Sequence, residues 1–256
     1  MKLTLPDDSV RELPEGSSGY DLAKDIGSGL AKAAVAVIVD GNQQDLHDVI
    51  NCDCSISIIT IDSDEGQEIM RHTLTAQVLA KAVKNLYPKS KLAIGPTIDN
   101  GFYYDFECPE TISVDDLEKI EEEMNKIIKS KSSITKRLLP KNDALKVFES
   151  LDETYKQEII NESNQGDNFQ LYYQDEDDFV DLCRGPHLPN LSLIGSFKLT
   201  KVSGAYWRGD SNNEMLQRIY GTSWASQKDL DSYLKRIEEA EKRDHRKLGK
   251  EMDLFH

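Results

Sequence analysis

The stretch "AVAVIVDG", residues 34–41, is a run of apolar residues that stops at the turn-forming pair Asp40-Gly41. Short apolar, β-branched runs that end at a turn signal are typical of buried strands. A second run, "CSISIITI", follows at 54–61. Two short alternating segments in 1–13 predict a hairpin, and 18–33 has apolar residues at helical spacing. Residues 1–62 therefore predict a small β-grasp-like unit.

The rest of the chain predicts a larger α+β unit over 63–225, followed by a connecting helix within 226–256. A polar stretch, "DSDEGQE" (62–68), is expected to be the linker between the units. The predicted elements beyond it are a helix over 73–88, a hairpin around Asn100-Gly101, an amphipathic helix over 113–131, short strands over 170–224 and a capped helix from 226.

Composition restricts the classes of function. The chain has 256 residues and a formal net charge of −15, the wrong sign for holding nucleic acid by its overall field. Four cysteines form no regular framework, which favours a reducing, cytoplasmic setting. No segment has the length or apolarity of a signal peptide or a membrane span. Any contact with nucleic acid is therefore expected to be local, weak and sensitive to salt.

The stretch "FVDLCRGPHLPN", residues 179–190, places Cys183 and His187 four residues apart. The spacing is compatible with half of a zinc site, with a thiolate and its base, or with two side chains that share a turn. A zinc site needs further ligands, and His72 is the only histidine on the helix where a second pair is expected. The glycine and the proline inside the motif favour a rigid loop that carries functional groups.

Two other segments are dense in aromatic and polar residues. "GAYWRGDSNNEMLQRIYG" (204–221) mixes aromatic rings with arginines and amides, a composition that can stack bases and hold phosphates or can simply build a core. In "GPTIDNGFYYDF" (95–106), Tyr103 and Tyr104 are adjacent in a strand, so one should face inward and the other outward.

Together, "GPTIDNGFYYDF", "DLCRGPH", "GAYWRGDSNN" and "LQRIYGTSWA", in this order, closely resemble the amino-terminal half of bacterial threonyl-tRNA synthetases. The resemblance covers the whole chain. It implies a ubiquitin-like TGS domain at 1–62, an editing domain at 63–225 and a helix that leads toward a class II catalytic core. The end at "DLFH" looks like a cut, and the resemblance places ATP, magnesium and zinc only in that core. A homodimer of the full-length enzyme is expected to form through the same core.

The resemblance also assigns roles to residues. The implied catalytic group is Lys156, Asp181, Cys183, His187 and His72. The implied substrate-binding group is Gln77, Thr73, Tyr104 and Arg184. The aromatic and basic composition, and not the resemblance, makes Arg208, Arg218 and Trp207 the expected tRNA contacts, helped by the basic residues of 235–247. No metal is expected in this part of the chain.

The chain departs from the family at "RHTLTAQ", residues 71–77, where the family has an H-x3-H motif. Alignment from the downstream side puts Thr73 and Gln77 at the two histidine positions. Alignment from the upstream side keeps His72 and requires one extra residue. His72 and Gln77 lie about 140° apart on a regular α-helix, so they share a face only where the helix is irregular.

The implied activity is hydrolysis of seryl-tRNA(Thr), the mischarged product. Serine lacks only the methyl group of threonine, and one methyl group supports only about 10–200-fold discrimination, so a second, size-selective site is needed. The expected partners are tRNA(Thr) and its seryl ester, with no membrane. The alternatives are a tRNA-binding module with impaired editing and a free-standing regulatory TGS protein.

Overall fold

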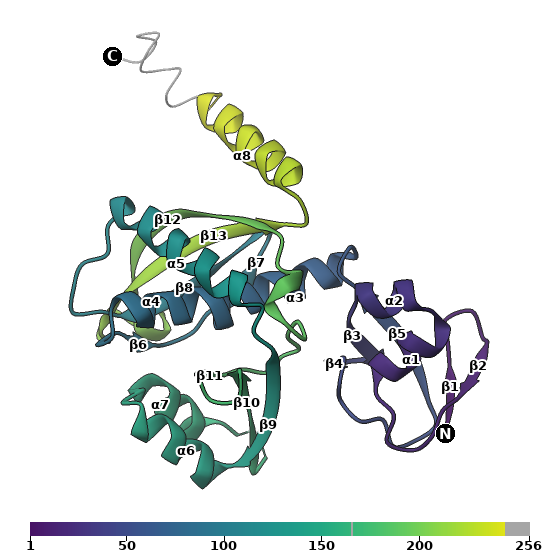
Figure 1. Ribbon diagram of the computed structural model, residues 1–256. Helices are drawn as coiled ribbons and strands as arrows, with labels where there is room; N and C mark the ends of the chain where they lie inside the picture. The colour runs from purple at the N-terminus through teal and green to yellow at the C-terminus, as the bar shows by residue number, and fades with distance from the viewer. Residues whose placement is uncertain (165, 244–256) are drawn as a thin grey trace.

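The structure is a computed structural model that describes residues 1–164 and 166–243. Figure 1 shows a small amino-terminal unit beside a larger one, with helix α3 leading from the first into the second and helix α8 projecting away. The larger unit contains two separate sheets with helices packed against them. The expected α+β class is confirmed.

The amino-terminal unit is a five-stranded sheet in the order β2-β1-β5-β3-β4, covered by two short helices. Its elements are β1 (Lys2–Thr4), β2 (Val10–Glu12), α1 (Gly19–Ile26), α2 (Ser28–Ala33), β3 (Ala34–Val39), β4 (Asn42–Asp45) and β5 (Cys54–Thr60). Strands β1 and β5 are parallel and the other neighbours are antiparallel. Asp40 and Gly41 both have positive φ, 47° and 81°, as a two-residue hairpin of type I′ requires. The predicted β-grasp arrangement is therefore present.

The expected polar linker at 62–68 is wrong, because helix α3 (Asp64–Thr73) begins inside it. The Ser63 hydroxyl caps this helix by accepting a hydrogen bond from the amide of Gly66. Gly66 lies so close to β5 that a Cβ there would be 2.0 Å from the carbonyl oxygen of Thr60. The polar residues of this stretch therefore belong to the first turn of a helix that packs directly against the amino-terminal sheet.

The helix that enters the larger unit changes its winding midway. After α3 comes a π-helical segment, η1 (Leu74–Leu79), and then α4 (Ala80–Leu86). The amide of Ala80 donates to the carbonyl of Thr75, five residues earlier, as in a π-helix. All six residues of η1 are buried. A π-turn holds one more residue than an α-turn, so the helix accommodates an extra residue at this point.

The first sheet of the larger unit has the order β12-β13-β8-β6, with β7 paired to β8. Its elements are β6 (Lys91–Leu92), β7 (Thr97–Ile98), β8 (Gly101–Glu107), β12 (Ser196–Tyr206), η4 (Trp207–Gly209) and β13 (Met215–Trp224). The expected hairpin at Asn100-Gly101 joins β7 and β8, and Asn100 has a φ of 58°. Helix α5 (Leu117–Ser130) follows η2 (Val114–Asp116) and the predicted capping box of Ser113 and Asp116. Tyr104 faces inward and is fully buried, as the alternation in β8 predicted for one of the two tyrosines.

The second sheet is three-stranded, in the order β11-β10-β9, and two helices pack on it. The elements are β9 (Ile134–Pro140), α6 (Lys141–Ser150), α7 (Thr154–Glu162), β10 (Asn168–Gln174), β11 (Phe179–Leu182) and η3 (Leu191–Leu193). No local pattern predicted β9, α6 and α7. This subdomain matters for the site because α7 carries Lys156, and β11 leads into the loop of Cys183 and His187.

Helix α8 (Gln227–Lys242) starts at the expected cap, Ser226. The predicted basic residues Arg246 and Lys247 lie outside the described residues. Within the described part of the chain, no helix combines the length and the apolar composition needed to cross a membrane.

Candidate active site

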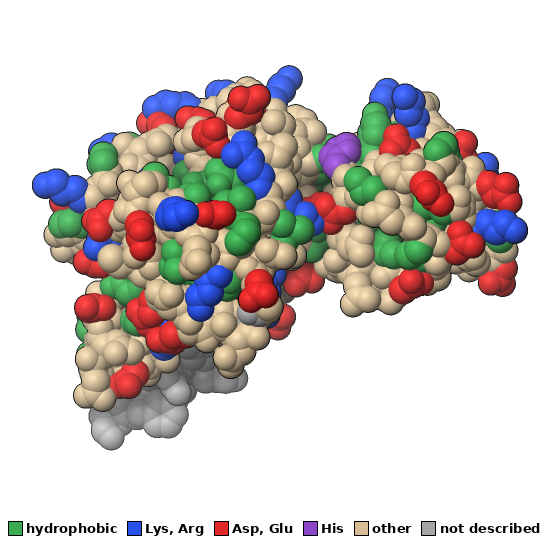
Figure 2. All heavy atoms as spheres, turned by 90° about the horizontal axis from the view of Figure 1, so that it is seen from below, with side chains coloured by type: hydrophobic (Ala, Val, Ile, Leu, Met, Phe, Trp, Pro, Cys, Tyr) green, Lys and Arg blue, Asp and Glu red, His purple; other side chains and the backbone are tan. Residues whose placement is uncertain are grey.

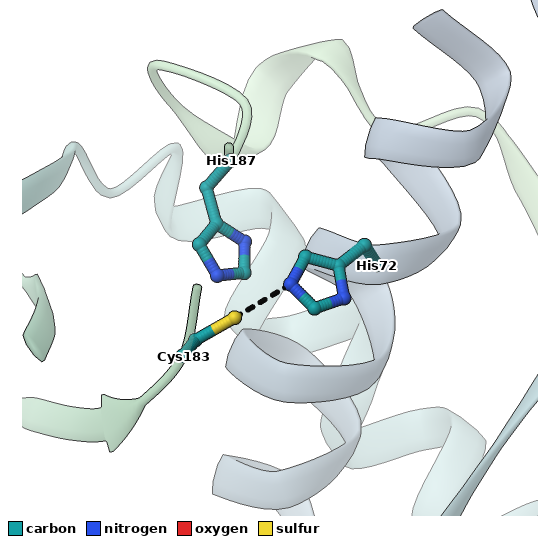
Figure 3. A group of neighbouring side chains, drawn as sticks. All are labelled: His72, Cys183 and His187. Atoms are coloured by element: carbon teal, nitrogen blue, oxygen red, sulfur yellow. Dashed lines mark hydrogen bonds between the residues drawn. The ribbon is translucent and has the colours of Figure 1, made fainter. Parts of the chain in front are cut away.

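Two distant parts of the chain place His72, Cys183 and His187 in one cluster (Figure 3). His72 is at the end of α3, and the other two lie in the loop that follows β11. The Nε2 of His72 is 2.6 Å from the Sγ of Cys183. The rings of His72 and His187 stack with centroids 4.6 Å apart and an angle of 17° between their planes. The structure therefore brings together three of the residues that the resemblance assigns to the catalytic group, and their catalytic role stays a prediction.

The π-helical segment explains how His72 reaches this cluster. Two alignments with the family's H-x3-H motif were possible from the sequence. The one that keeps His72 as the first histidine needs one extra residue, and the wider π-helical turn of η1 accommodates that residue. Gln77 is buried on another side, where its Nε2 donates to the carbonyl of Tyr172 and its Oε1 accepts from Gln174. Ala76, not Gln77, lines the cavity beside His72. The expected contact of Gln77 with substrate is therefore contradicted.

Thr73 holds the loop instead of facing a substrate. Its hydroxyl donates to the carbonyl of Ile69 at 2.9 Å and accepts from the amide of Leu188 at 2.9 Å. Because the hydroxyl hydrogen is already used, the Nδ1 of His187, 3.1 Å away, acts as the donor in that contact. The Nε2 of His187 is then unprotonated, and it is buried without a hydrogen-bond partner among the described residues. The predicted role of Thr73 in substrate binding is contradicted, since its side chain is fully buried.

Burial keeps these three groups uncharged. It lowers the pKa of His72 to about 4, opposed by the charge of Asp45. Burial, and then the neighbouring His72, lower the pKa of His187 well below its ordinary value. Burial raises the pKa of the Cys183 thiol to about 12. At neutral pH the cluster therefore offers two neutral imidazoles and a protonated thiol.

A second group of polar side chains lies across the same cavity. Lys156 and Asp181 form an ion pair at 2.7 Å, with side chains only 3% and 2% exposed. The hydroxyl of Tyr104 donates to Asp181 at 2.9 Å and accepts from Lys156 at 3.0 Å. Burial, and then Asp181, raise the pKa of Tyr104 well above its ordinary value. The three predicted residues thus form one buried, mutually satisfied network.

The two groups line a cavity of about 560 Å³. His72 and Cys183 lie on its wall with Lys156 and Asp181, while the exposed Arg184 also lines it. Gly95 keeps the wall open, because a Cβ there would be 2.2 Å from the ring of Tyr104. The volume is within the range of small-molecule sites. The cavity therefore holds the buried ammonium of Lys156 near the uncharged side chains of His72 and Cys183.

The cluster also has the donor set for a metal. The ligand atoms of His72, Cys183 and His187 all lie within 4.8 Å of one another. Three nitrogen or sulfur ligands with an open fourth position are the usual pattern of catalytic zinc. The expectation that this part of the chain binds no metal stays a prediction.

Comparison with known proteins places this geometry in a family. The family described as "TGS domain" matches residues 1–60, and "Threonyl and Alanyl tRNA synthetase second additional domain" matches 170–220. "Threonine--tRNA ligase" of Acidithiobacillus ferrooxidans is 52% identical over 99% of this chain and 39% of its own length. The proteins of that name in Acetivibrio thermocellus and Francisella philomiragia are both 51% identical, over 100% of this chain and 40% of their own length.

The chain belongs to the threonine--tRNA ligase family. It spans 39% to 40% of the length of these relatives and matches their amino-terminal part. Residues 1–60 are its TGS domain, and the match at 170–220 includes the loop of Cys183 and His187. The cavity is thus lined in part by residues of this matched segment, among them Asp181, Cys183 and Arg184.

The residues predicted to contact tRNA are already engaged within the protein. Trp207 is only 4% exposed, its Nε1 donates to Glu158, and its ring meets Tyr155 edge-on. It offers no open face to a base, so the prediction for Trp207 is contradicted. The tryptophan of "GAYWRGD" is a core residue in this ligase family member.

Both predicted arginines have acidic partners. Arg218 forms two hydrogen bonds with Asp105, at 2.6 and 2.8 Å, and lies over the ring of Tyr103. Arg208 pairs with Glu158 and Glu162. On the face shown in Figure 2, basic and acidic side chains are intermingled over both units. The two arginines therefore present no uncompensated positive charge to a phosphate.

Sequence reasoning missed two groups around the site. Gly95 is the first residue of "GPTIDNGFYYDF". Its role becomes visible only once Tyr104 is placed, because a Cβ at Gly95 would collide with that ring. Asp45, at the end of β4 in the TGS domain, accepts a hydrogen bond from the amide of His187. No local pattern marks an aspartate 142 residues away from its partner.

Proposed function

We propose that this chain hydrolyses the ester bond of seryl-tRNA(Thr). The observation that carries the proposal is the cavity that the Lys156–Asp181 ion pair lines together with the neutral imidazole of His72 and the thiol of Cys183. The relatives are named threonine--tRNA ligases, so the proposed nucleic acid is tRNA(Thr). A ligase that must reject serine by one methyl group needs a second, hydrolytic site.

Water is the proposed nucleophile. The pKa of Cys183, raised to about 12 by burial, leaves on the order of one thiol in 10⁵ ionised at pH 7, which disfavours a thiolate attack. A neutral imidazole at the cavity wall, His72, accepts a proton from the water as its oxygen attacks the ester carbonyl. The bond to the ribose oxygen then breaks, and the proton passes to that oxygen. No covalent intermediate with the protein is needed.

Lys156 is the proposed electrostatic group. Its ammonium is buried, held by Asp181 and Tyr104, and lines the cavity. A fixed cation in a water-poor site stabilises the negative charge that develops on the carbonyl or the leaving oxygen. Asp181 and Tyr104 orient the ammonium and occupy its other donors.

The test is release of serine from seryl-tRNA(Thr), with threonyl-tRNA(Thr) as the comparison. Lys156→Ala and His72→Ala are expected to lower the rate by about 10²–10⁴-fold. Lys146→Ala, at an exposed lysine of α6, is the matched control and should keep the wild-type rate. Circular dichroism of each variant separates lost activity from lost fold. A wild-type chain that releases no serine would refute the proposal.

A second candidate is a tRNA-binding module with impaired editing. The observation in its favour is Gln77, which replaces a family histidine and points away from the cavity. Binding of tRNA(Thr) by the wild-type chain without any release of serine would support it.

We expect hydrolysis to proceed without zinc. Glutamine is a poor zinc ligand, and Gln77 is bound to β10, so the cluster lacks the fourth side-chain donor of a structural zinc site. The proposed water activation by His72 and stabilisation by Lys156 need no metal. The measurement is the zinc content of the purified chain and its deacylation rate after dialysis against a chelator. Stoichiometric zinc, or loss of activity that added zinc restores, would contradict this expectation.

A further inference from the structure

One carboxylate of the TGS domain reaches the loop of the candidate site. Asp45 ends β4, on the side of the TGS domain that faces the larger unit (Figure 1). Its Oδ1 accepts a hydrogen bond from the backbone amide of His187 at 2.9 Å. Its Oδ2 accepts one from the hydroxyl of Tyr172 at 2.7 Å and also pairs with Lys136 at 3.0 Å. Both oxygens of Asp45 are therefore used across the domain boundary.

The contact with Tyr172 fixes the loop from a second direction. The Tyr172 ring meets the His187 ring edge-on, with centroids 4.4 Å apart. Its hydroxyl lies against Gly185, where a Cβ would come within 1.9 Å of the oxygen. Gly185 has a φ of 66°, so both its backbone conformation and this close approach suit glycine alone. The hydroxyl that Asp45 holds is thus part of the wall that shapes the loop.

Apolar packing joins the same loop to the TGS sheet. Leu188, the neighbour of His187, is fully buried in a cluster with Val35, Ala36 and Ile59 of strands β3 and β5. Ile69 and Met70 of α3 complete the cluster. The His187–Leu188 pair is therefore wedged between the TGS domain and the helix that carries His72.

We infer that the TGS domain is a positioning element of the editing site and that Asp45 is its positioning residue. The inference rests on the proposed function for its catalytic part. Asp45 touches neither the cavity nor a reacting atom; it fixes the amide of His187 and the hydroxyl of Tyr172. This holds residues 183–188 against His72. The TGS domain thereby acts on hydrolysis without contacting the aminoacyl ester.

The first arm of the test is kinetic. Asp45→Ala is expected to lower kcat for seryl-tRNA(Thr) by about 10–100-fold with little change in KM, because small misplacements of catalytic groups act on the chemical step. Asp45→Asn keeps one acceptor oxygen and should lie between the wild type and Asp45→Ala. Its similar volume also keeps it informative if the alanine variant does not fold.

The matched control is Asp48→Ala. Asp48 carries the same charge and pairs with the same Lys136. Its Oδ2 accepts a hydrogen bond from the backbone amide of Asp45, but no described hydrogen bond joins Asp48 to the loop of 183–188. It should retain the wild-type kcat. Equal losses in Asp45→Ala and Asp48→Ala would mean that charge near Lys136, and not the contact with the loop, is responsible, and would overturn the inference.

The second arm does not depend on any enzymatic activity. Amide hydrogen exchange, followed by mass spectrometry, should become at least about tenfold faster over 183–188 in Asp45→Ala and stay unchanged in Asp48→Ala. Exchange in β8 should not change in either variant. If the wild-type chain releases no serine, the proposed function fails while this arm still decides the positioning. Unchanged exchange over 183–188, or faster exchange with wild-type kcat, would refute the role of Asp45.

Discussion

At the scale of single residues, burial sets the chemistry of the site. His72, Cys183 and His187 come from two segments, and all three are shifted toward their uncharged forms by loss of solvent. Lys156 and Asp181 are just as buried, yet each has an opposite charge at 2.7 Å and a shared tyrosine hydroxyl. The cavity is thus lined both by uncharged groups and by a charged pair.

The lowered pKa of His72 makes the stability of the protein depend on pH. His72 has a folded pKa of about 4, against 6.5 in an unfolded chain. Between these values the unfolded state binds more protons, so the free energy of unfolding falls as the pH drops from 6.5 toward 4. We expect His72→Gln to show a shallower loss of stability over this window, measured by urea unfolding. His47→Gln, at an exposed site, should keep the wild-type slope. Identical slopes for all three proteins would contradict the lowered pKa.

The contacts of Gln77 change the expectation for its substitution. Gln77→His would restore a histidine at one position of the family's H-x3-H motif. In the structure the buried amide bonds to the carbonyl of Tyr172 and to the side chain of Gln174. Losing buried hydrogen bonds costs about 1–3 kcal/mol. Gln77→His is therefore expected to lower the free energy of unfolding by that amount, without a gain in deacylation.

The control for this variant is Gln227→His, an exposed glutamine at the start of α8. It should unfold at the wild-type urea concentration. A Gln77→His variant of wild-type stability with faster deacylation would show that the imidazole turns into the cavity.

At the scale of elements, two local irregularities of one helix connect the domains and build the site. Ser63 and Gly66 let α3 start against β5, where the sequence predicted a linker. The π-turn η1 then absorbs the extra residue of "RHTLTAQ" and keeps His72 beside Cys183. π-turns occur frequently at functional sites, since they alter the facing of a few residues without breaking the helix.

The start of α3 gives a matched pair of glycine substitutions. Gly66→Ala would place a Cβ 2.0 Å from the carbonyl oxygen of Thr60, so a backbone must move, at a cost of about 1–3 kcal/mol. Gly29→Ala lies in α2 with no atom within 4 Å of the new Cβ and should stabilise the protein by about 0.5–1 kcal/mol. Thermal unfolding of both variants measures the difference. If the two substitutions had the same effect, the close packing of α3 on β5 would be in error.

At the scale of the whole molecule, the net charge limits the binding of nucleic acid, and contacts between the domains join the TGS domain to the larger unit. The net charge of −15 opposes the phosphates of a tRNA, and the predicted arginines are paired internally. The TGS domain, in contrast, is joined to the larger unit by Asp45 and by the cluster around Leu188. We therefore regard the contact between the TGS domain and the larger unit as specific. We expect any contact with nucleic acid to be local.

We expect the isolated chain to bind tRNA(Thr) weakly and with a shallow dependence on salt. The slope of log K against log salt reports the number of phosphates that are neutralised, about 0.9 per phosphate on a duplex. Because Arg208 and Arg218 are paired with acidic side chains, the slope should correspond to only about one to three phosphates. A salt titration of binding measures it, with Arg208→Ala expected to change the slope little. A steep slope would show that a basic surface has been overlooked, whereas tight binding that ignores salt would show that the contact is not electrostatic.

Local rules were enough for most elements of the TGS domain and of the first sheet, and for part of the site, but not for β9, α6 and α7. Hairpin pairs such as Asp40-Gly41, the capping box of Ser113, and strand alternation at Tyr104 act through neighbouring atoms, so the sequence determined them. The motifs around Cys183 likewise indicated the family. The linker failed because a serine cap and a glycine next to β5 become visible only once the two elements meet.

Only the tertiary structure decided which face each side chain presents. Trp207 turned inward, Arg218 found Asp105, and Gln77 bonded to β10, because each contact joins residues far apart in the chain. Asp45 belongs to a different domain from the loop it holds. Burial and partner choice depend on how distant segments pack, and no local pattern of residues encodes them. The sequence determined the family and the elements; packing determined the charges and the contacts within the site.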